Sequence, residues 1–470
     1  MMWWKELIHN GKRCRSVSDL ADIMDWPVTF RQSAGVGYVV KADDKLKMTQ
    51  DKKSIGAVSV AVIAILLTAF SSLWFAPQRG LPVKQWHDNL LAELHDTRMP
   101  LLIQDSPTQM WNTSHWTLQH VVSKFATWPL SIHEASPPVF KHYDPNLELA
   151  TKFPPPFNTS KASNKHQVTA LLKSRNASVG YYINDELKRI APDLGRDIHP
   201  VKPFVTHSAA GSTFVKLWVG GPRVVANLHY DATHNIFHQV DGEKRFILFP
   251  PSSFQHLYVY SRLHPSHRQS QLDLTQPSSI LASFPLYQNA AAHRIDVTLK
   301  PGDTMYLPPF WFHCVITDAP SVSINVWSDS PELQIFHRVL QNPVPYLSDF
   351  EARGWVYDHP THLFGLQLFV TKLLARSMPQ SKQFVDAYVD SQRRTGIPIE
   401  SFECGQASSK AIDEKMNQAM KIVVRSLVKD SFGQMKASSA AILVMSFIEA
   451  LLAQYIDLST FQVFSIHASN

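Results

Sequence analysis

The pattern of hydrophobic positions divides the chain after residue 200 into two regions. From residue 213 to 327, short apolar runs rich in Val, Ile and Phe alternate with turn sequences such as Asp241-Gly242 and Pro301-Gly302-Asp303. Short strands at this spacing are typical of an all-β barrel or sandwich. After Ser330 the apolar positions recur with the helical period. We therefore expect residues 331–470 to form a helical C-terminal region.

An uncharged apolar segment lies much earlier in the chain, at residues 54–75. As a helix it would reach about 33 Å, enough to cross the hydrocarbon core of a bilayer. We predict a single N-terminal transmembrane helix here. A buried core helix is the alternative, but core helices rarely run so long without a polar residue. A cleavable signal is disfavoured because the segment begins too far from the N-terminus.

The charges that flank this segment predict its orientation. Five lysines precede it closely, whereas only Arg79 and Lys84 follow it closely. The positive-inside rule then makes residues 1–53 a cytosolic tail and residues 54–75 a signal anchor. Three glycosylation triplets, at Asn112, Asn158 and Asn176, all follow the span. We expect a single-pass type II membrane glycoprotein whose main domain lies in the lumen of the endoplasmic reticulum or Golgi, or outside the cell.

Composition narrows the classes of function. Hydrophobic residues make up 44% of the 470 residues and charged residues 18%, which is typical of a folded protein. The net charge is only +6 and basic runs are absent from the sequence, so we do not expect a nucleic-acid partner. Three cysteines without CxxC spacing argue against a zinc finger. The apolar segment 438–455, interrupted by Glu449, predicts a packed helix or one that forms a homodimer.

Candidate metal chemistry lies in the segment VVANLHYDATHNIFHQVDGEKRFILFPP, residues 224–251. Its His229 and Asp231 are two residues apart, so on a strand their side chains share one face. Such a pair alone arises easily by chance, but a second segment, LKPGDTMYLPPFWFHCV, brings His313. Two histidines and one carboxylate form the facial triad of non-haem Fe(II) oxygenases, which leaves metal positions open for a cosubstrate and dioxygen.

Several segments together resemble the JmjC family of cupin-like oxygenases, and most of all its asparaginyl-hydroxylase branch, typified by factor inhibiting HIF. The similarity is carried, in order, by HYDATHNIFHQVDGEKRFILFPP, HPSHRQSQLDL, PGDTMYLPPFWFHCV and SINVWS. Weaker similarity begins near Pro100 with RMPLLIQ and HWTLQHVV. The resemblance implies a mainly β fold, a double-stranded β-helix of the cupin jelly-roll type with flanking helices, over a catalytic domain at residues 80–330.

The resemblance also implies the residues that hold the cofactors. His229, Asp231 and His313 match the ligands of Fe(II) and are the catalytic centre. Lys244 matches the lysine that binds the distal carboxylate of the cosubstrate 2-oxoglutarate; without the family it would be interpreted as a surface lysine after a turn. Ala226 stands where the asparaginyl hydroxylase has a threonine, which removes one hydroxyl from the cosubstrate pocket.

Further residues match the family less closely. Asn235 and Asn325 match amides near the metal-bound end of 2-oxoglutarate, although both also suit ordinary strand or turn positions. Tyr182 resembles a tyrosine at the distal carboxylate. Arg268 and Gln269 match a pair that hydrogen-bonds the substrate side chain.

The implied activity is a 2-oxoglutarate-dependent dioxygenase that uses O2 to hydroxylate a side chain of a protein or peptide, forming succinate and CO2. Histone demethylation fits poorly with a lumenal domain. Two alternatives remain: an oxygenase that acts on a small molecule or an RNA base, and a catalytically inactive cupin-fold domain for binding or chaperoning. An inactive relative should have lost an iron ligand, and all three are present.

Overall fold

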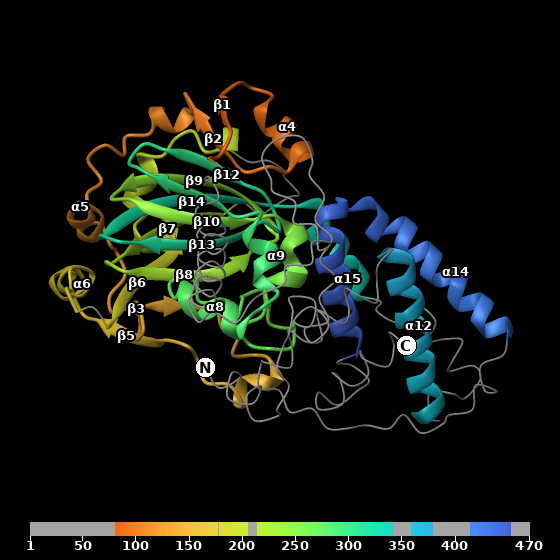
Figure 1. Cartoon of the computed structure of the whole chain (residues 1–470). Coiled ribbons are helices and arrows are strands. Elements are labelled where there is room, and N and C mark those ends of the chain that lie inside the picture. Colours follow the sequence, from red (N-terminus) through yellow and green to blue (C-terminus); the bar gives the residue numbers. More distant parts are fainter. Residues whose placement is uncertain (1–79, 177, 205–213, 342–358, 379–413, 453–470) are drawn as a thin grey trace, which may run out of the picture. The chain divides into compact units, whose positions relative to one another are not determined.

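The computed structural model describes residues 80–452, apart from residue 177 and residues 205–213, 342–358 and 379–413 (Figure 1). The predicted cytosolic tail, 1–53, and the predicted membrane span, 54–75, lie outside the described residues. None of the helices in the described part of the chain combines the length and the apolar composition that a bilayer span requires. The N-terminal anchor therefore stays a prediction from the sequence.

The centre of the described chain is a jelly roll of two antiparallel four-stranded sheets. One sheet has the order β12-β9-β14-β7 and the other the order β11-β10-β13-β8. Their bounds are β7 (Phe214–Gly220), β8 (Val224–Tyr230), β9 (Thr233–Asp241), β10 (Lys244–Phe249), β11 (Ile295–Leu299), β12 (Thr304–Leu307), β13 (Phe312–Thr317) and β14 (Ser321–Asp329). Because the chain passes between the two sheets, both inner faces close on one core. This confirms the predicted mainly β, cupin-like core.

Earlier strands extend both sheets at their edges. The first sheet gains β1 (Val83–Gln85) and β2 (Leu101–Gln104) beside β12, and it gains β6 (Gly180–Glu186), β3 (Leu130–Ala135) and β5 (Asn158–Ala162) beyond β7. The second gains β4 (Val139–Phe140) beside β8. The flanking helices are α4 (Leu90–Thr97), α5 (Leu118–Ser123), α6 (Lys165–Leu172), α7 (Leu187–Ile190), α8 (Pro277–Ser283) and α9 (Tyr287–Ala291).

The larger sheet is covered on one face by α4 to α7. Their buried Leu90, Val121 and Leu172 pack in one cluster with Leu217 of β7 and Ile324 of β14. Short 3-10 helices complete the connections: η1 (Pro107–Met110), η2 (Glu148–Thr151), η3 (Pro192–Arg196), η4 (Lys202–Phe204), η5 (Pro251–His256) and η6 (Phe432–Gln434). The burial of apolar side chains against the sheet is the main term that stabilises this layer.

The turn between β9 and β10 has the glycine that its geometry needs. Gly242 has a φ of +68°, and a Cβ there would lie 2.4 Å from the Pro320 carbonyl oxygen. Only glycine accepts both constraints without strain. The Asp241 carboxylate accepts hydrogen bonds from the backbone N–H groups of Gly242 and Leu118, at 3.1 and 2.9 Å. This predicted turn places Lys244 at the first position of β10.

The described residues after Ser330 form long helices: α10 (Pro331–Gln341), α12 (His359–Ser377), α14 (Glu414–Asp430) and α15 (Ala437–Leu452). In Figure 1 these helices lie to one side of the sheets, with α15 close to the smaller one. Buried Phe447 and Ile448 of α15 share a cluster with Phe254 of η5 and Phe312 of β13. The apolar face of α15 is thus used within the chain.

A carboxyl group is buried where α15 meets the loop after η5. Glu449 is 2% exposed, and its Oε2 accepts a hydrogen bond from the backbone N–H of Arg262 at 2.6 Å. Burial raises the pKa of Glu449 to about 8, although hydrogen bonds from Arg262 and Ser261 oppose the shift. The C-terminal helix therefore holds this loop through a carboxyl group that is easily neutralised.

The pKa of Glu449 predicts a pH dependence of stability. In the folded state the pKa of Glu449 lies above its ordinary value of 4.5. The contribution of the protonated carboxyl group to the free energy of unfolding is therefore complete below about pH 4.5 and is lost as pH rises through 8. Glu449→Gln removes this titration. We expect the free energy of unfolding of the wild type to fall by roughly 3–5 kcal/mol more than that of the variant between pH 5 and 9, since one pKa unit corresponds to about 1.4 kcal/mol.

Urea unfolding at a series of pH values measures this difference. Glu243→Gln, at an exposed position in the turn after β9, is the matched control and should follow the wild type. Parallel pH profiles for Glu449→Gln and the wild type would contradict the assignment.

Candidate metal centre

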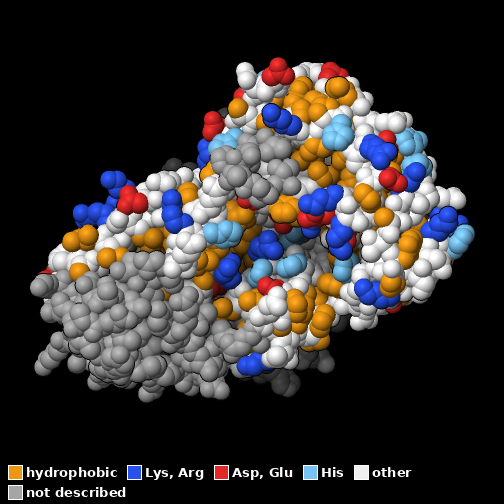
Figure 2. Space-filling view, turned by 180° about the vertical axis from the view of Figure 1, so that it is seen from behind, with side chains coloured by type: hydrophobic (Ala, Val, Ile, Leu, Met, Phe, Trp, Pro, Cys, Tyr) orange, Lys and Arg blue, Asp and Glu red, His pale blue; other side chains and the backbone are white. Residues whose placement is uncertain are grey.

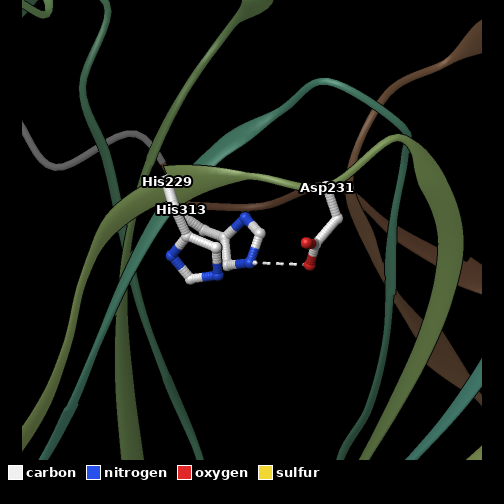
Figure 3. Close-up of side chains that lie close together, drawn as sticks. All are labelled: His229, Asp231 and His313. Atoms are coloured by element: carbon white, nitrogen blue, oxygen red, sulfur yellow. Dashed lines mark ion pairs between the residues drawn. The ribbon is translucent and has the colours of Figure 1, made fainter. Parts of the chain in front are cut away.

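Pairing between two strands brings the candidate ligands together. His229 in β8 lies directly opposite His313 in β13, and their ring centroids are 4.1 Å apart. Asp231 follows the end of β8, and its backbone carbonyl accepts a hydrogen bond from the N–H of Phe310 at 2.7 Å. Figure 3 shows the two imidazoles side by side with the carboxylate facing them. A bulge after His313 interrupts the pairing, as is common beside active sites.

Backbone carbonyl groups fix the orientation of both imidazoles. Nδ1 of His229 lies 2.6 Å from the Asn227 oxygen, and Nδ1 of His313 lies 3.0 Å from the Trp311 oxygen. A carbonyl oxygen only accepts hydrogen bonds, so each Nδ1 carries the proton. The lone pair is then on Nε2, where a metal ion would be bound.

Electrostatics keep these three groups in the protonation states of metal ligands. Burial and the neighbouring His313 lower the pKa of His229 to about 3, and burial lowers that of His313. Burial alone would raise the pKa of Asp231, but His229, His313 and the cationic Arg268 and Lys216 together outweigh burial and the pKa is lowered. At neutral pH the set is therefore two neutral imidazoles and one carboxylate.

The ligand atoms are close enough to share one ion. One nitrogen or oxygen atom from each of the three residues lies within 4.8 Å of the others, and Nε2 of His313 is 3.7 Å from Oδ2 of Asp231. Among the described residues, this is the cluster of His, Cys, Asp or Glu side chains that could hold a metal ion. Its nitrogen and oxygen donors suit a divalent transition metal.

A cavity of about 480 Å³ adjoins the three ligands, and it contains a buried ammonium group. Lys244 is 6% exposed, and its Nζ donates to the hydroxyl of Ser323 at 2.7 Å. The same Nζ lies 5.4 Å from the centroid of the Phe237 ring. Burial lowers the pKa of Lys244 to about 7. In the described part of the chain it has no ion-pair partner, so its counter-charge is missing.

The predicted amides and tyrosine line the same cavity. Asn325 in β14 donates from Nδ2 to Oδ1 of Asn235 in β9 at 3.0 Å, and the buried Oδ1 of Asn325 has no hydrogen-bond partner in the described structure. Tyr182 in β6 stacks on Trp218 with ring centroids 6.0 Å apart, and burial raises its pKa. Ala226 in β8 also lines the cavity.

Arg268 and Gln269 reach the cavity from the loop after η5. A backbone bridge joins Gln269 to His229, and the N–H of Tyr230 donates to the Arg268 carbonyl at 3.3 Å. Nη1 of Arg268 lies 3.9 Å from Oδ1 of Asp231. The buried Oε1 of Gln269 has no hydrogen-bond partner within the described residues. All nine residues singled out in the sequence thus line one cavity.

Lys216, Trp218 and Trp327 are among the cavity residues that were not singled out from the sequence. The buried Nε1 atoms of both indoles have no hydrogen-bond partner in the described part of the chain. Nζ of Lys216 lies 4.8 Å from the Trp327 ring centroid. The signal was present in the alternation of strand residues, because Trp327 is two residues from Asn325 and must share its face.

A buried cation without a counter-charge should reduce stability. The pKa of about 7 for Lys244 lies below its ordinary 10.5, so the cost is complete below pH 7 and disappears as pH rises through about 10.5. We expect Lys244→Met to raise the free energy of unfolding of the ligand-free protein by roughly 3–5 kcal/mol at pH 6. At pH 10 the gain should be small.

Thermal and urea unfolding at these two pH values measure the gain. Lys188→Met is the matched control, because its side chain is 82% exposed. A loss of stability in Lys244→Met at pH 6 would show that the ammonium group is compensated in the folded protein.

Comparisons with known proteins agree with this geometry. The profile of a cupin-like domain family matches residues 88–333, more than half of the 470 residues. Jumonji C domain-containing protein 5 of Drosophila melanogaster is 31% identical over 153 residues, which are 32% of this chain and 37% of that protein. The mouse tRNA wybutosine-synthesizing protein 5 is 26% identical over 254 residues, 52% of this chain and 76% of that protein.

A lysine-specific demethylase of Arabidopsis thaliana is 29% identical over 116 residues, 25% of this chain and 21% of that protein. The chain thus spans well under half of the Drosophila and Arabidopsis relatives. The similarity to these proteins confirms the predicted JmjC-type domain. The chain belongs to the cupin-like domain family.

Proposed function

We propose that the protein is an Fe(II)- and 2-oxoglutarate-dependent oxygenase that hydroxylates a protein side chain. One observation carries the proposal: a His–Asp–His ligand set and a buried, uncompensated lysine line the same cavity. The first feature suits a metal and the second suits a carboxylate. Membership of a cupin-like family with JmjC relatives supports the same class of chemistry.

The residues present fit Fe(II). His229 and His313 offer Nε2 lone pairs and Asp231 an ionised carboxylate, all within one buried cluster. This is the facial triad that holds Fe(II) and leaves positions for two further ligands. Iron bound here with 2-oxoglutarate and O2 would supply oxidative decarboxylation to succinate and CO2, coupled to hydroxylation of a C–H bond.

The residues present also fit a dicarboxylate cosubstrate. The Lys244 ammonium group is positioned to donate a charge-assisted hydrogen bond to a carboxylate. The unpaired indole N–H groups of Trp218 and Trp327 are further donors on the cavity wall. Ala226 contributes no hydroxyl at its position, so we infer that more of the binding energy depends on Lys244.

The contacts beside the metal ligands support the asparaginyl-hydroxylase branch. Arg268 offers only donors, whereas the unpartnered Oε1 of Gln269 is an acceptor. A carboxamide has one acceptor and one donor group and would satisfy both. We infer that this pair holds the side chain that is hydroxylated while the cavity around it excludes water.

RNA-base oxidation is a second candidate, favoured by one observation. The match to mouse tRNA wybutosine-synthesizing protein 5 covers 52% of this chain and 76% of that protein. Mass spectrometry separates the two candidates: proteins or transfer RNA are incubated with the enzyme, with and without 2-oxoglutarate, and gained oxygen is located in peptides or nucleosides. An inactive binding domain is disfavoured because all three metal-ligand side chains are kept.

We further propose that the domain faces the lumen or the cell exterior, held by residues 54–75. The asparagines of the three glycosylation triplets, Asn112, Asn158 and Asn176, are exposed, as acceptors of glycans must be. A homodimer through the C-terminal helices also remains a proposal. One exposed apolar residue there is Ile422 of α14.

Loss of either imidazole should abolish turnover. We expect His229→Ala and His313→Ala to form succinate at below about 1% of the wild-type rate, because two remaining ligands do not hold the ion in the required geometry. Circular dichroism should show an unchanged fold. The control is His166→Ala, at an exposed position in α6. Wild-type succinate formation in either variant would exclude the assigned ligands.

Lys244 tests the cosubstrate independently of the metal. Removing one partner of a buried charge pair costs about 3–5 kcal/mol, so Lys244→Ala should raise the KM for 2-oxoglutarate in uncoupled turnover by roughly two to three powers of ten. Lys244→Arg should lie between alanine and the wild type, because it keeps the charge in an unsuitable shape. Bound iron should be unchanged in both. An unaltered KM in Lys244→Ala would point to another cosubstrate.

A further inference from the structure

The charges around the cavity do not balance. Four cationic side chains line it, those of Lys141, Lys216, Lys244 and Arg268, against the single carboxylate of Asp231. Under the proposed function, Fe(II) adds two positive charges and 2-oxoglutarate two negative ones. Together with Asp231 and Lys244, these make the inner site neutral. Of the three remaining cations, Arg268 lies 3.9 Å from Oδ1 of Asp231. Among the described residues, Lys141 and Lys216 are then left without a counter-charge.

The two lysines and Arg268 come from different parts of the fold. Lys141 directly follows β4 at the edge of the smaller sheet, and Lys216 lies in β7 of the larger sheet. Arg268 belongs to the loop that is bridged to β8. Figure 2 shows a hollow on one face of the molecule around which Lys, Arg and His side chains gather, with few acidic ones.

Aromatic rings hold the two lysines in place. Nζ of Lys216 lies 4.8 Å from the Trp327 ring centroid, and Nζ of Lys141 lies 5.2 Å from that of Tyr260. Within the described residues, neither lysine has a carboxylate oxygen within the 4.0 Å of an ion pair. A cation–π contact orients an ammonium group without neutralising it. Both charges remain available to an anionic ligand.

We propose that Lys141 and Lys216 recognise an acidic side chain of a polypeptide substrate, close to the residue that is hydroxylated. The inference rests on the proposed function and specifies its substrate class as an acidic protein segment. Lys216 lines the same cavity as Asp231, and Nη1 of Arg268 lies 3.9 Å from Oδ1 of Asp231, so a carboxylate bound here lies close to the reacting position. A cavity lined by charges of one sign concentrates and orients the opposite sign.

A nucleic acid fits this arrangement less well. Its binding spreads over many phosphates along an open basic surface. Here the unpaired cations gather in one cavity of about 480 Å³. Farther from the hollow, the face in Figure 2 carries acidic as well as basic side chains. One carboxylate group matches this site better than a phosphate backbone.

A random peptide library tests the inference on the full-length protein loaded with Mn(II) and 2-oxoglutarate under nitrogen, so that no turnover occurs. Peptides retained by the wild type should be enriched in Asp or Glu at one position. With Lys216→Glu the preference should change to Lys or Arg at that position. Lys188→Glu is the matched control for the charge change, because its side chain is 82% exposed and lies outside the cavity.

Fluorescence anisotropy of one selected acidic peptide measures how much Lys216 contributes to its affinity. Lys216→Gln should weaken binding about fivefold to tenfold and flatten its salt dependence. In a second peptide the acidic residue is replaced by lysine. The Lys216→Glu variant should bind this second peptide more tightly than it binds the original one. Peptides without a charge preference, or an unchanged preference in Lys216→Glu, would overturn the inference. So would a ten-nucleotide RNA that displaces the peptides at lower concentration.

A separate measurement distinguishes this inference from the proposed function. The shift in Tm caused by 2-oxoglutarate with Mn(II) reports the cosubstrate alone. A wild-type protein that is not stabilised by 2-oxoglutarate contradicts the proposed function. A protein that is stabilised but selects no acidic peptides contradicts only the substrate class.

Discussion

The pairing of β8 with β13 is the constraint on which the candidate site depends. It places His229 opposite His313, and the neighbouring pair of Tyr230 and Phe312 keeps the same register. A slip of one residue would turn every side chain of β13 to the other face of the sheet. His313 would then point into the apolar cluster that now holds Phe312. The packing of Phe312 therefore selects the register that creates the candidate metal site.

The space between these two sheets contains an apolar cluster on one side and the polar cavity on the other. Phe237, Phe246, Leu248 and Met305 fill one apolar cluster between the sheets. Lys244 stands at the border of this cluster, against the ring of Phe237 and on the face of β10 that Phe246 shares. A strand that presents an ammonium group to this interior is destabilised as long as the charge has no partner. Such local conflicts mark functional sites in folded proteins.

Local sequence patterns predicted turns and strand faces, but not the pairing of distant strands. The Asp241-Gly242 turn and the shared face of His229 and Asp231 follow from spacing alone. The partnership with His313 was predicted from the second segment and supported by the family resemblance, but its register was not predictable, because strand pairing over such a separation leaves no local signal. Local spacing suggested a surface lysine at Lys244, yet strand alternation from the turn onward places it on the buried face. The predicted membrane span lies outside the described residues.

Contacts between distant segments also connect the C-terminal region to the cavity. Glu449 of α15 accepts a hydrogen bond from the backbone of Arg262, 187 residues earlier in the chain. The loop that begins there continues to Arg268, whose carbonyl accepts from Tyr230 between two of the metal-ligand residues. A displacement of α15 would move this loop and with it the Arg268 guanidinium. The helical region therefore supports the loop that carries Arg268 without lining the candidate metal site, a dependence that neither segment reveals in its own sequence.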